Sequence, residues 1–148
     1  MIRRRSMLYG TSVLLDFSKA FDKVPHCHLL HKLDRYGVRG QTLAWISAFL
    51  SGRSQRVVCE VCTSPSAAVI SGVPQGTVLG PLLFLAYIND LPECVSSTAR
   101  LFADDSLIYG RINLTKDSEI LRQDLNRLQD WEDKWICPST PTNVKFSK

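Results

Sequence analysis

The sequence predicts an α+β domain. Three observations support this: a short apolar run that ends at an acid, segments with the periodicity of amphipathic helices, and two apolar runs around adjacent aspartates. At 148 residues the chain is long enough for one domain with a hydrophobic core. Hydrophobic residues make up 45% and charged residues 22% of the chain, which disfavours a disordered or collagen-like protein.

The first half of the chain is expected to contain a strand, two helices and further strands. Residues 12–16 are apolar and partly β-branched, which is typical of a buried strand, and this run ends at Asp16. Leucines recur at helical spacing in residues 28–36, and a second helical segment covers residues 41–50. Two more strands are predicted at residues 55–62 and 67–70.

The second half is expected to contain a helix and a β-hairpin that carries two acids. A turn-rich segment at residues 71–76 leads to a predicted helix at 82–89, and Pro81 suits the first turn of that helix. Residues 99–109 form two short apolar runs. Asp104 and Asp105 separate these runs, so we expect both to lie in the turn of a hairpin.

A long amphipathic helix is predicted at residues 115–135. Its apolar residues keep close to the period of 3.6, and Thr115 is a favourable N-cap. We expect the core to include the three tryptophans, which lie at amphipathic spacing: Trp45, Trp131 and Trp135.

The cysteine pattern favours an intracellular protein, without distinguishing nucleus from cytoplasm. Five cysteines are an odd number, and their scattered positions are typical of free thiols in a reducing compartment. Cys59 and Cys62 are three apart within one predicted strand, so we expect their side chains on opposite faces and no zinc site. No apolar run is long enough for a membrane span, so no membrane partner is expected. The net charge of +4 permits a nucleic-acid partner without demonstrating one.

Three features are unusual for a domain without a catalytic role: Asp16 at a strand end, a Gly/Pro/Gln loop before a helix, and the Asp104–Asp105 pair. Each alone is typical of an ordinary turn, because aspartate and glycine are favoured turn residues. Together they indicate a site for divalent ions, since Mg²⁺ prefers a few carboxylate oxygens and leaves other positions to water and phosphate. Two such ions can clamp a phosphoryl displacement.

Three motifs in this order resemble the reverse transcriptases of LINE-type (non-LTR, jockey-like) retrotransposons. Residues 15–26 (LDFSKAFDKVPH) are similar to motif A of that family, residues 71–84 (SGVPQGTVLGPLLF) to motif B, and residues 101–106 (LFADDS) to motif C. Connecting segments extend the resemblance over residues 13–135. The resemblance implies a polymerase palm, a small antiparallel sheet backed by helices, with RNA-directed DNA polymerase activity. The implied partners are an RNA template, a DNA primer and deoxynucleoside triphosphates (dNTPs).

The resemblance also assigns the acids. Asp16 corresponds to the motif A metal ligand, Asp104 to the motif C ligand, and Asp105 to the second, less directly ligating acid of motif C. The carbonyl oxygen of Phe17 is implied as a further ligand. The implied cofactors are two Mg²⁺ ions, with Mn²⁺ as a substitute.

Further residues are expected to contact nucleotide or template. Phe21 lies at the position of the family's aromatic steric gate, which excludes a 2′ hydroxyl, although from sequence alone a phenylalanine there would be interpreted as core. Gln75 and Gly76 match the motif B pair that lines the nucleotide pocket. Arg53 and Arg56 are candidates for template phosphates, as arginines often are, although exposed strand arginines are usually only solvated.

Other polar residues near these motifs receive structural interpretations. Asp22 lies beyond the predicted strand end and is interpreted as a turn or helix-cap residue rather than a metal ligand. The histidines at 26, 28 and 31 are interpreted as surface or packed helix residues rather than zinc ligands.

The resemblance divides the chain into three parts: a basic, irregular N-terminal remnant at residues 1–12, the palm at 13–135, and a divergent tail at 136–148. The tail differs from the family's usual Asn-Pro-x-Lys-Cys segment, and we interpret it as the product of a frameshift. The fingers, thumb and endonuclease regions of the family are expected to be missing.

Two alternatives to an active reverse transcriptase stay open from the sequence. A catalytically inert remnant of a retrotransposon would carry the same motifs. An RNA-dependent RNA polymerase palm also pairs a motif A acid with a two-acid hairpin, but a polar residue in place of Phe21 would favour it.

Overall fold

The computed structural model describes residues 4–7, 10–17, 19–103, 105–110 and 115–135. The chain divides into two compact units. We call the first the sheet unit (Met1–Ala20 and Ile88–Lys148) and the second the ribbon unit (Phe21–Tyr87). Helices and antiparallel strands are both present, so the predicted α+β class is confirmed. Asp104 and the predicted tail at 136–148 lie outside the described residues.

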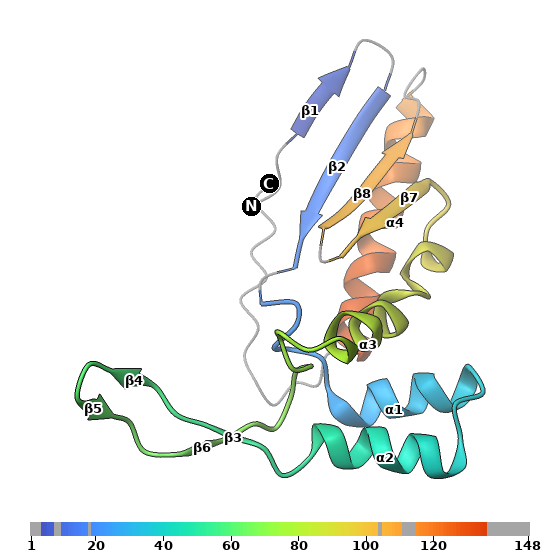
Figure 1. Cartoon of the computed structure of the whole chain (residues 1–148). Coiled ribbons are helices and arrows are strands. Elements are labelled where there is room, and N and C mark those ends of the chain that lie inside the picture. The colour runs from blue at the N-terminus through green and yellow to red at the C-terminus, as the bar shows by residue number, and fades with distance from the viewer. Residues whose placement is uncertain (1–3, 8–9, 18, 104, 111–114, 136–148) are drawn as a thin grey trace. The chain divides into compact units, whose positions relative to one another are not determined.

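The sheet unit contains a four-stranded antiparallel sheet in the order β1-β2-β8-β7 (Figure 1). The strands are β1 (Arg4–Met7), β2 (Gly10–Asp16), β7 (Thr98–Phe102) and β8 (Asp105–Gly110). The expectation of an irregular N-terminus is wrong for residues 4–7, because they pair with β2 as an edge strand. The prediction that Asp105 lies in the hairpin turn is also wrong, since Asp105 is paired with Phe102 as the first residue of β8.

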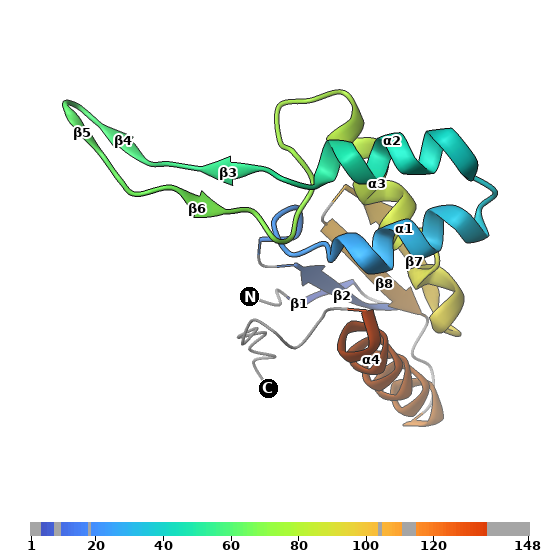
Figure 2. The same ribbon diagram turned by 90° about the horizontal axis from the view of Figure 1, so that it is seen from below.

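One helix, α4 (Thr115–Trp135), covers a face of this sheet, as the two orthogonal views agree (Figures 1 and 2). Its length matches the prediction. Its buried residues recur at helical spacing and include Leu121, Leu128, Trp131 and Trp135. The Trp131 indole nitrogen donates a hydrogen bond to the Asp90 carboxylate at 3.2 Å, just before the short 3₁₀ helix η1 (Leu91–Cys94).

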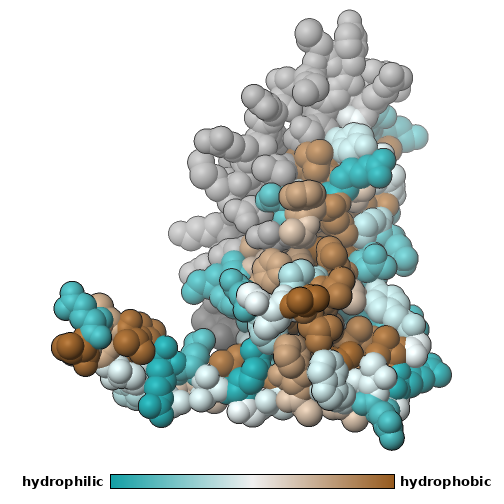
Figure 3. Space-filling model, in the orientation of Figure 1, coloured by the Kyte–Doolittle hydropathy of each residue, from teal (hydrophilic) through white to brown (hydrophobic). Residues whose placement is uncertain are grey.

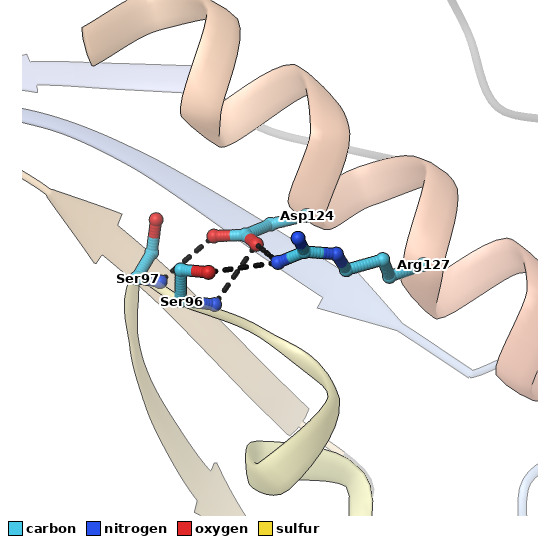
Figure 4. Close-up of polar contacts among 4 residues, drawn as sticks. All are labelled: Ser96, Ser97, Asp124 and Arg127. Carbon is cyan, nitrogen blue, oxygen red and sulfur yellow. Dashed lines mark hydrogen bonds and ion pairs between the residues drawn. The ribbon is translucent and has the colours of Figure 1, made fainter.

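A carboxylate on α4 ties the helix to the start of β7 (Figure 4). The side chain of Asp124 is completely buried and accepts hydrogen bonds from the backbone amides of Ser96 (2.9 Å) and Ser97 (2.8 Å). Arg127 forms an ion pair with it at 3.0 Å and also donates to the Ser96 hydroxyl at 2.7 Å. Burial by itself raises the pKa of Asp124, but the hydrogen bonds and the Arg127 charge outweigh it and lower the pKa overall.

The ribbon unit is built on helices α1 (His26–Arg35), α2 (Gly40–Leu50) and all but the last residue of α3 (Leu79–Ile88). All three predicted helices are confirmed, with ends shifted by a few residues. Lys32 is buried, and its ammonium donates to the Tyr87 carbonyl at 2.7 Å and lies over the Tyr87 ring. Trp45 was expected in the core, but it is 56% exposed and stacks on Phe49 of the same helix.

A two-stranded ribbon leads away from α2 and returns to the loop before α3 (Figure 1). Its ladders join β3 (Ser54–Gln55) to β6 (Ala67–Ala68) and β4 (Val58–Cys59) to β5 (Cys62–Thr63). The prediction of one strand over residues 55–62 is therefore wrong, because the chain reverses at Glu60 and Val61. The prediction that Cys59 and Cys62 point to opposite faces is wrong as well, since the two residues are cross-strand partners.

The ribbon exposes apolar side chains, visible as brown atoms near its tip in Figure 3. Exposed residues on it include Val57, Val58, Val61 and Ile70. Over the described part of the chain, no helix combines the length and apolar character needed to span a membrane.

Candidate active site

The sheet unit places two of the predicted catalytic positions side by side. Strands β2 and β8 are antiparallel neighbours, and their register pairs Asp16 directly with Asp105. This pair closes the shared ladder, one step beyond Leu15 and Ser106. Residues 89 positions apart in the sequence are thus brought together by strand pairing alone.

Strand alternation sets Asp105 apart from the buried face of the sheet. Leu15 and Ser106 are register partners, as are Val13 and Ile108, and all four are buried. Successive residues of a strand face opposite sides, so the next position along β8, that of Asp105, belongs to the other face. Asp105 is exposed. The end of the ladder therefore presents a carboxylate to solvent.

The connection between β7 and β8 is tight. Phe102 and Asp105 are register partners, and only two positions separate them in the sequence. Ala103 has φ +52°, a left-handed conformation that costs a non-glycine residue about 1 kcal/mol or more. Such strain is common where a turn has to aim a functional side chain.

The Phe17 carbonyl follows directly after β2. It accepts a hydrogen bond from the Ala20 amide at 3.1 Å. A carbonyl oxygen has two lone pairs, so this bond leaves capacity for a second partner.

The donor set at this edge suits a hard divalent cation. Like charges directly opposite each other destabilise an antiparallel pair, and a cation between Asp16 and Asp105 would offset that repulsion. Carboxylate and carbonyl oxygens are the ligands that Mg²⁺ prefers. Within the described ranges, which omit Asp104, no cluster of three or more His, Cys, Asp or Glu side chains forms a candidate metal site.

The ribbon unit holds the predicted nucleotide-binding residues on two segments that are bonded to each other. The Val73 amide donates to the Phe21 carbonyl at 2.9 Å, and the Gly72 amide donates to the Val24 carbonyl at 2.8 Å. The Ser71 hydroxyl donates to the Asp22 carbonyl at 2.8 Å. Hydrogen bonds to backbone carbonyls therefore join the segment after motif A to the motif B loop.

Gly72 makes this close approach feasible. It has φ +88°, and a Cβ atom there would lie 2.8 Å from both the Cα and the carbonyl oxygen of Asp22. Any larger residue would therefore separate the two segments. Gly76 also has a positive φ, +76°, but open space surrounds the place of its Cβ.

Phe21 and Gln75 have defined partners within the ribbon unit. The Phe21 ring is partly exposed and stacks on the buried Phe84 ring of α3, with centroids 4.4 Å apart. The Gln75 amide donates to the Asp22 carboxylate at 3.1 Å. Asp22 thus does more than the predicted turn or cap residue, because it orients a candidate nucleotide contact. Sequence spacing gave no signal for this pair, since the two residues are 53 positions apart.

The two predicted template arginines differ. Arg53 donates from Nε to the Leu50 carbonyl at 3.0 Å and from Nη2 to the Gly72 carbonyl at 3.0 Å. The Nε2 atom of His26 also forms a hydrogen bond with the Gly72 carbonyl, at 2.9 Å. Arg56 is exposed on the ribbon. The guanidinium of Arg53 is therefore engaged in holding the motif B loop, whereas Arg56 is accessible.

Comparison with known proteins places these motifs in a family. Residues 4–143 match the family model described as reverse transcriptase (RNA-dependent DNA polymerase). The RNA-directed DNA polymerase from mobile element jockey of Drosophila funebris is 32% identical over 94% of this chain. The probable RNA-directed DNA polymerase from transposon X-element of Drosophila melanogaster is also 32% identical over 94%. The chain spans 16% of the length of each of these two relatives.

A more distant similarity extends to another element. The retrovirus-related Pol polyprotein from type-1 retrotransposable element R2 of Popillia japonica is 29% identical over 80% of the chain. Similarity to relatives from jockey, the X-element and R2 confirms the predicted resemblance to reverse transcriptases of retrotransposons.

Proposed function

This chain belongs to the reverse transcriptase (RNA-dependent DNA polymerase) family, and from that premise we propose that it contributes the palm of an RNA-directed DNA polymerase of a non-LTR retrotransposon. The reaction is extension of a DNA primer on an RNA template with dNTPs. The observation that carries the proposal is the register of β2 and β8, which pairs Asp16 with Asp105 at the end of their shared ladder.

The proposed metal ligands are Asp16, Asp104, Asp105 and the carbonyl oxygen of Phe17. Two Mg²⁺ ions bound there, or Mn²⁺ in their place, would activate the primer hydroxyl and neutralise the triphosphate. In this proposal, the role of the protein is to hold carboxylates from two neighbouring strands next to each other. Because the sheet fixes this register, the acids need little reorganisation to act together.

The proposed nucleotide contacts are Phe21, Gln75 and Gly76. The Phe21 ring is restrained by stacking on Phe84, and its backbone carbonyl is bonded to Val73. A restrained ring suits a steric gate, since a freely rotating side chain could not exclude one hydroxyl group. The Gln75 side chain is oriented by Asp22, and the glycine at position 76 leaves open space beside the backbone.

The proposed template contacts are Arg56 and, with less of its guanidinium available, Arg53. Arginine side chains that face phosphates fix nucleic acid in register without reading its sequence. The hydrogen bonds of Arg53 favour a positioning role for it, so we assign the direct phosphate contact to Arg56. We place the reaction inside the cell, in the nucleus or the cytoplasm.

The metal assignment is tested in a chimera in which residues 13–135 replace the corresponding region of the Drosophila funebris jockey polymerase. We expect Asp16→Asn and Asp104→Asn each to reduce primer extension by at least about a hundredfold, because each removes a charge that holds the ions. Template binding, measured by fluorescence anisotropy, should change little. Asp130→Asn, on the exposed side of α4, is the matched control.

Two results would count against this proposal. Extension by either acid variant within about tenfold of the unsubstituted chimera would remove that residue from the metal site. A chimera that binds template with normal affinity and never extends a primer would instead support the catalytically inert remnant.

The same chimera tests the gate. Phe21→Ala should lower discrimination against ribonucleotides by about tenfold or more, because removal of the ring opens space beneath the 2′ position of the sugar. The measurement is the ratio of kcat/KM for a deoxynucleotide and the matching ribonucleotide. Phe84→Leu, which removes the stacking partner, should shift the same ratio less. An unchanged ratio in Phe21→Ala would make Phe21 a packing residue.

A further inference from the structure

Two exposed cysteines face each other at the tip of the ribbon. Cys59 ends β4 and Cys62 begins β5, and the register pairs these residues directly. The two residues between them reverse the chain, with Glu60 at φ +52°. Both cysteines are free and exposed. This arrangement differs from a single extended strand, in which residues three apart would lie on opposite faces.

The pairing places the two thiols within reach of a disulfide. Residues directly opposite each other in an antiparallel pair have Cα atoms about 4.5 or 5.5 Å apart, depending on the type of pair. Disulfides join residues with Cα atoms about 4.4–6.8 Å apart. Both types of cross-strand pair therefore meet the Cα–Cα requirement for a disulfide.

The surroundings leave the thiols open to solutes. The neighbouring Val58 and Val61 are 69% and 96% exposed. Each ladder of the ribbon contains only two residue pairs, and an isolated two-stranded hairpin is only marginally stable. A covalent link between β4 and β5 would restrict this end of the ribbon.

The ribbon also connects helix α2 to the motif B loop. It begins after α2, and its returning strand leads to Val69, whose amide donates to the Arg53 carbonyl at 2.9 Å. Gly72 and the motif B loop follow three residues later. The cysteine pair thus lies in the segment that joins α2 to the candidate nucleotide loop.

We propose that Cys59 and Cys62 form a redox-responsive dithiol that exchanges with low-molecular-weight disulfides such as glutathione disulfide. One cysteine thiolate attacks a sulfur of glutathione disulfide, the S–S bond breaks, and one glutathione leaves as a thiolate that takes up a proton. The second cysteine thiolate then attacks the resulting mixed disulfide at the protein sulfur and releases the second glutathione. Two cysteine thiols are oxidised to one disulfide, and one glutathione disulfide is reduced to two thiols.

Two sulfur ligands do not make a structural zinc site, which requires four protein ligands. Over the described residues, no group of three or more potential ligands includes this pair. The reactivity that the geometry supports is therefore thiol–disulfide exchange.

The test uses the full 148-residue chain with Cys27→Ser, Cys94→Ser and Cys137→Ser, so that only the pair remains. The protein is equilibrated anaerobically in glutathione redox buffers, quenched in acid, alkylated and analysed by mass spectrometry. We expect a species that has lost two hydrogen atoms and carries neither glutathione nor the alkylating group. The matched control adds Cys62→Ser and Thr63→Cys, which moves one thiol a single residue out of register.

In native buffer the equilibrium constant for disulfide formation should be at least about tenfold larger for the Cys59–Cys62 protein than for the control. The reason is that the two thiols of the control lie on opposite faces of the ribbon. In concentrated guanidinium chloride the two constants should converge, since the spacing in an unfolded chain is nearly the same. Equal constants in native buffer would overturn the proposal. Mixed disulfides with glutathione as the main product would overturn it too.

Discussion

Two aspartates of the sheet unit illustrate opposite uses of the same charge. Asp124 is completely buried and accepts hydrogen bonds from two backbone amides and an arginine. Asp105 is exposed, and its cross-strand partner is another acid, Asp16. The first carboxylate is satisfied within the chain, whereas the second faces solvent.

The two carboxylates also differ in how well their immediate surroundings are satisfied. A buried carboxylate is costly unless it is paired and hydrogen-bonded, and Asp124 meets both conditions. Around Asp105 the conditions are reversed: the preceding turn contains Ala103 at φ +52°, and the following Ser106 hydroxyl is buried with no hydrogen-bond partner among the described residues. Unsatisfied groups and strained turns concentrate at functional sites.

The largest expected effect is at the satisfied carboxylate. Asp124→Asn should lower the free energy of unfolding by about 3 kcal/mol. The substitution removes the charge from the hydrogen bonds, and it places the new side-chain NH₂ group against backbone amides and a guanidinium, which are also donors. Urea unfolding of the full chain measures this as a lower midpoint with an unchanged m-value. Asp130→Asn, exposed on the same helix, should change stability by less than about 0.5 kcal/mol. Equal effects of the two substitutions would contradict the structural role of Asp124.

A smaller effect is expected from acid. The pKa of Asp124 is lowered from 3.8, because hydrogen bonds and the charge of Arg127 outweigh the effect of burial, so the folded state binds this proton more weakly than the unfolded state. The stability that Asp124 contributes is therefore complete above the unfolded pKa and is lost as the pH falls through the lower folded pKa. The difference in unfolding free energy between the unsubstituted chain and Asp124→Asn should be constant near neutral pH and shrink below about pH 4. A difference independent of pH would show that the charge of Asp124 is not what stabilises the fold.

Much of this architecture could be predicted because its signals are local. The apolar spacing of α4 predicts both of its ends, and the apolar run before Asp16 predicts β2. The hairpin of β7 and β8 was predicted from two apolar runs, although Asp105, which was expected in the turn, is the first residue of β8. The sequence analysis expected the strand that ends at Asp16 to lie beside the hairpin that carries the acid pair. It did not predict the register, which pairs Asp16 with Asp105.

The features that could not be predicted depend on partners far away in the sequence. Asp124 lies three residues after Leu121 and four before Leu128, so helical spacing places it on the buried face of α4. Its partners are 27 and 28 positions away, and the helical pattern gives no signal for them. The ribbon turn at Glu60 and Val61 contains no Gly, Asn or Pro, so it lacks the usual hairpin signal. β1 is an edge strand rich in arginine, and its pairing depends on β2 rather than on its own composition.

The smallest effect is expected at the exposed carboxylate. Asp105→Asn removes one of two like charges at a strand pair, so without divalent ions the free energy of unfolding should stay the same or rise by a few tenths of a kcal/mol. Adding Mn²⁺ should then stabilise the unsubstituted chain, because a ligand that binds only the folded state raises stability in proportion to RT ln(1 + [L]/Kd). The variant should gain less, since it offers the ion one carboxylate fewer. Urea unfolding with a chelator and then with excess Mn²⁺ measures both quantities, and Asp130→Asn again serves as the control. If the gain from Mn²⁺ were the same in all three proteins, Asp105 would not belong to a cation site. The contrast with Asp124 would then reduce to one buried and one exposed carboxylate.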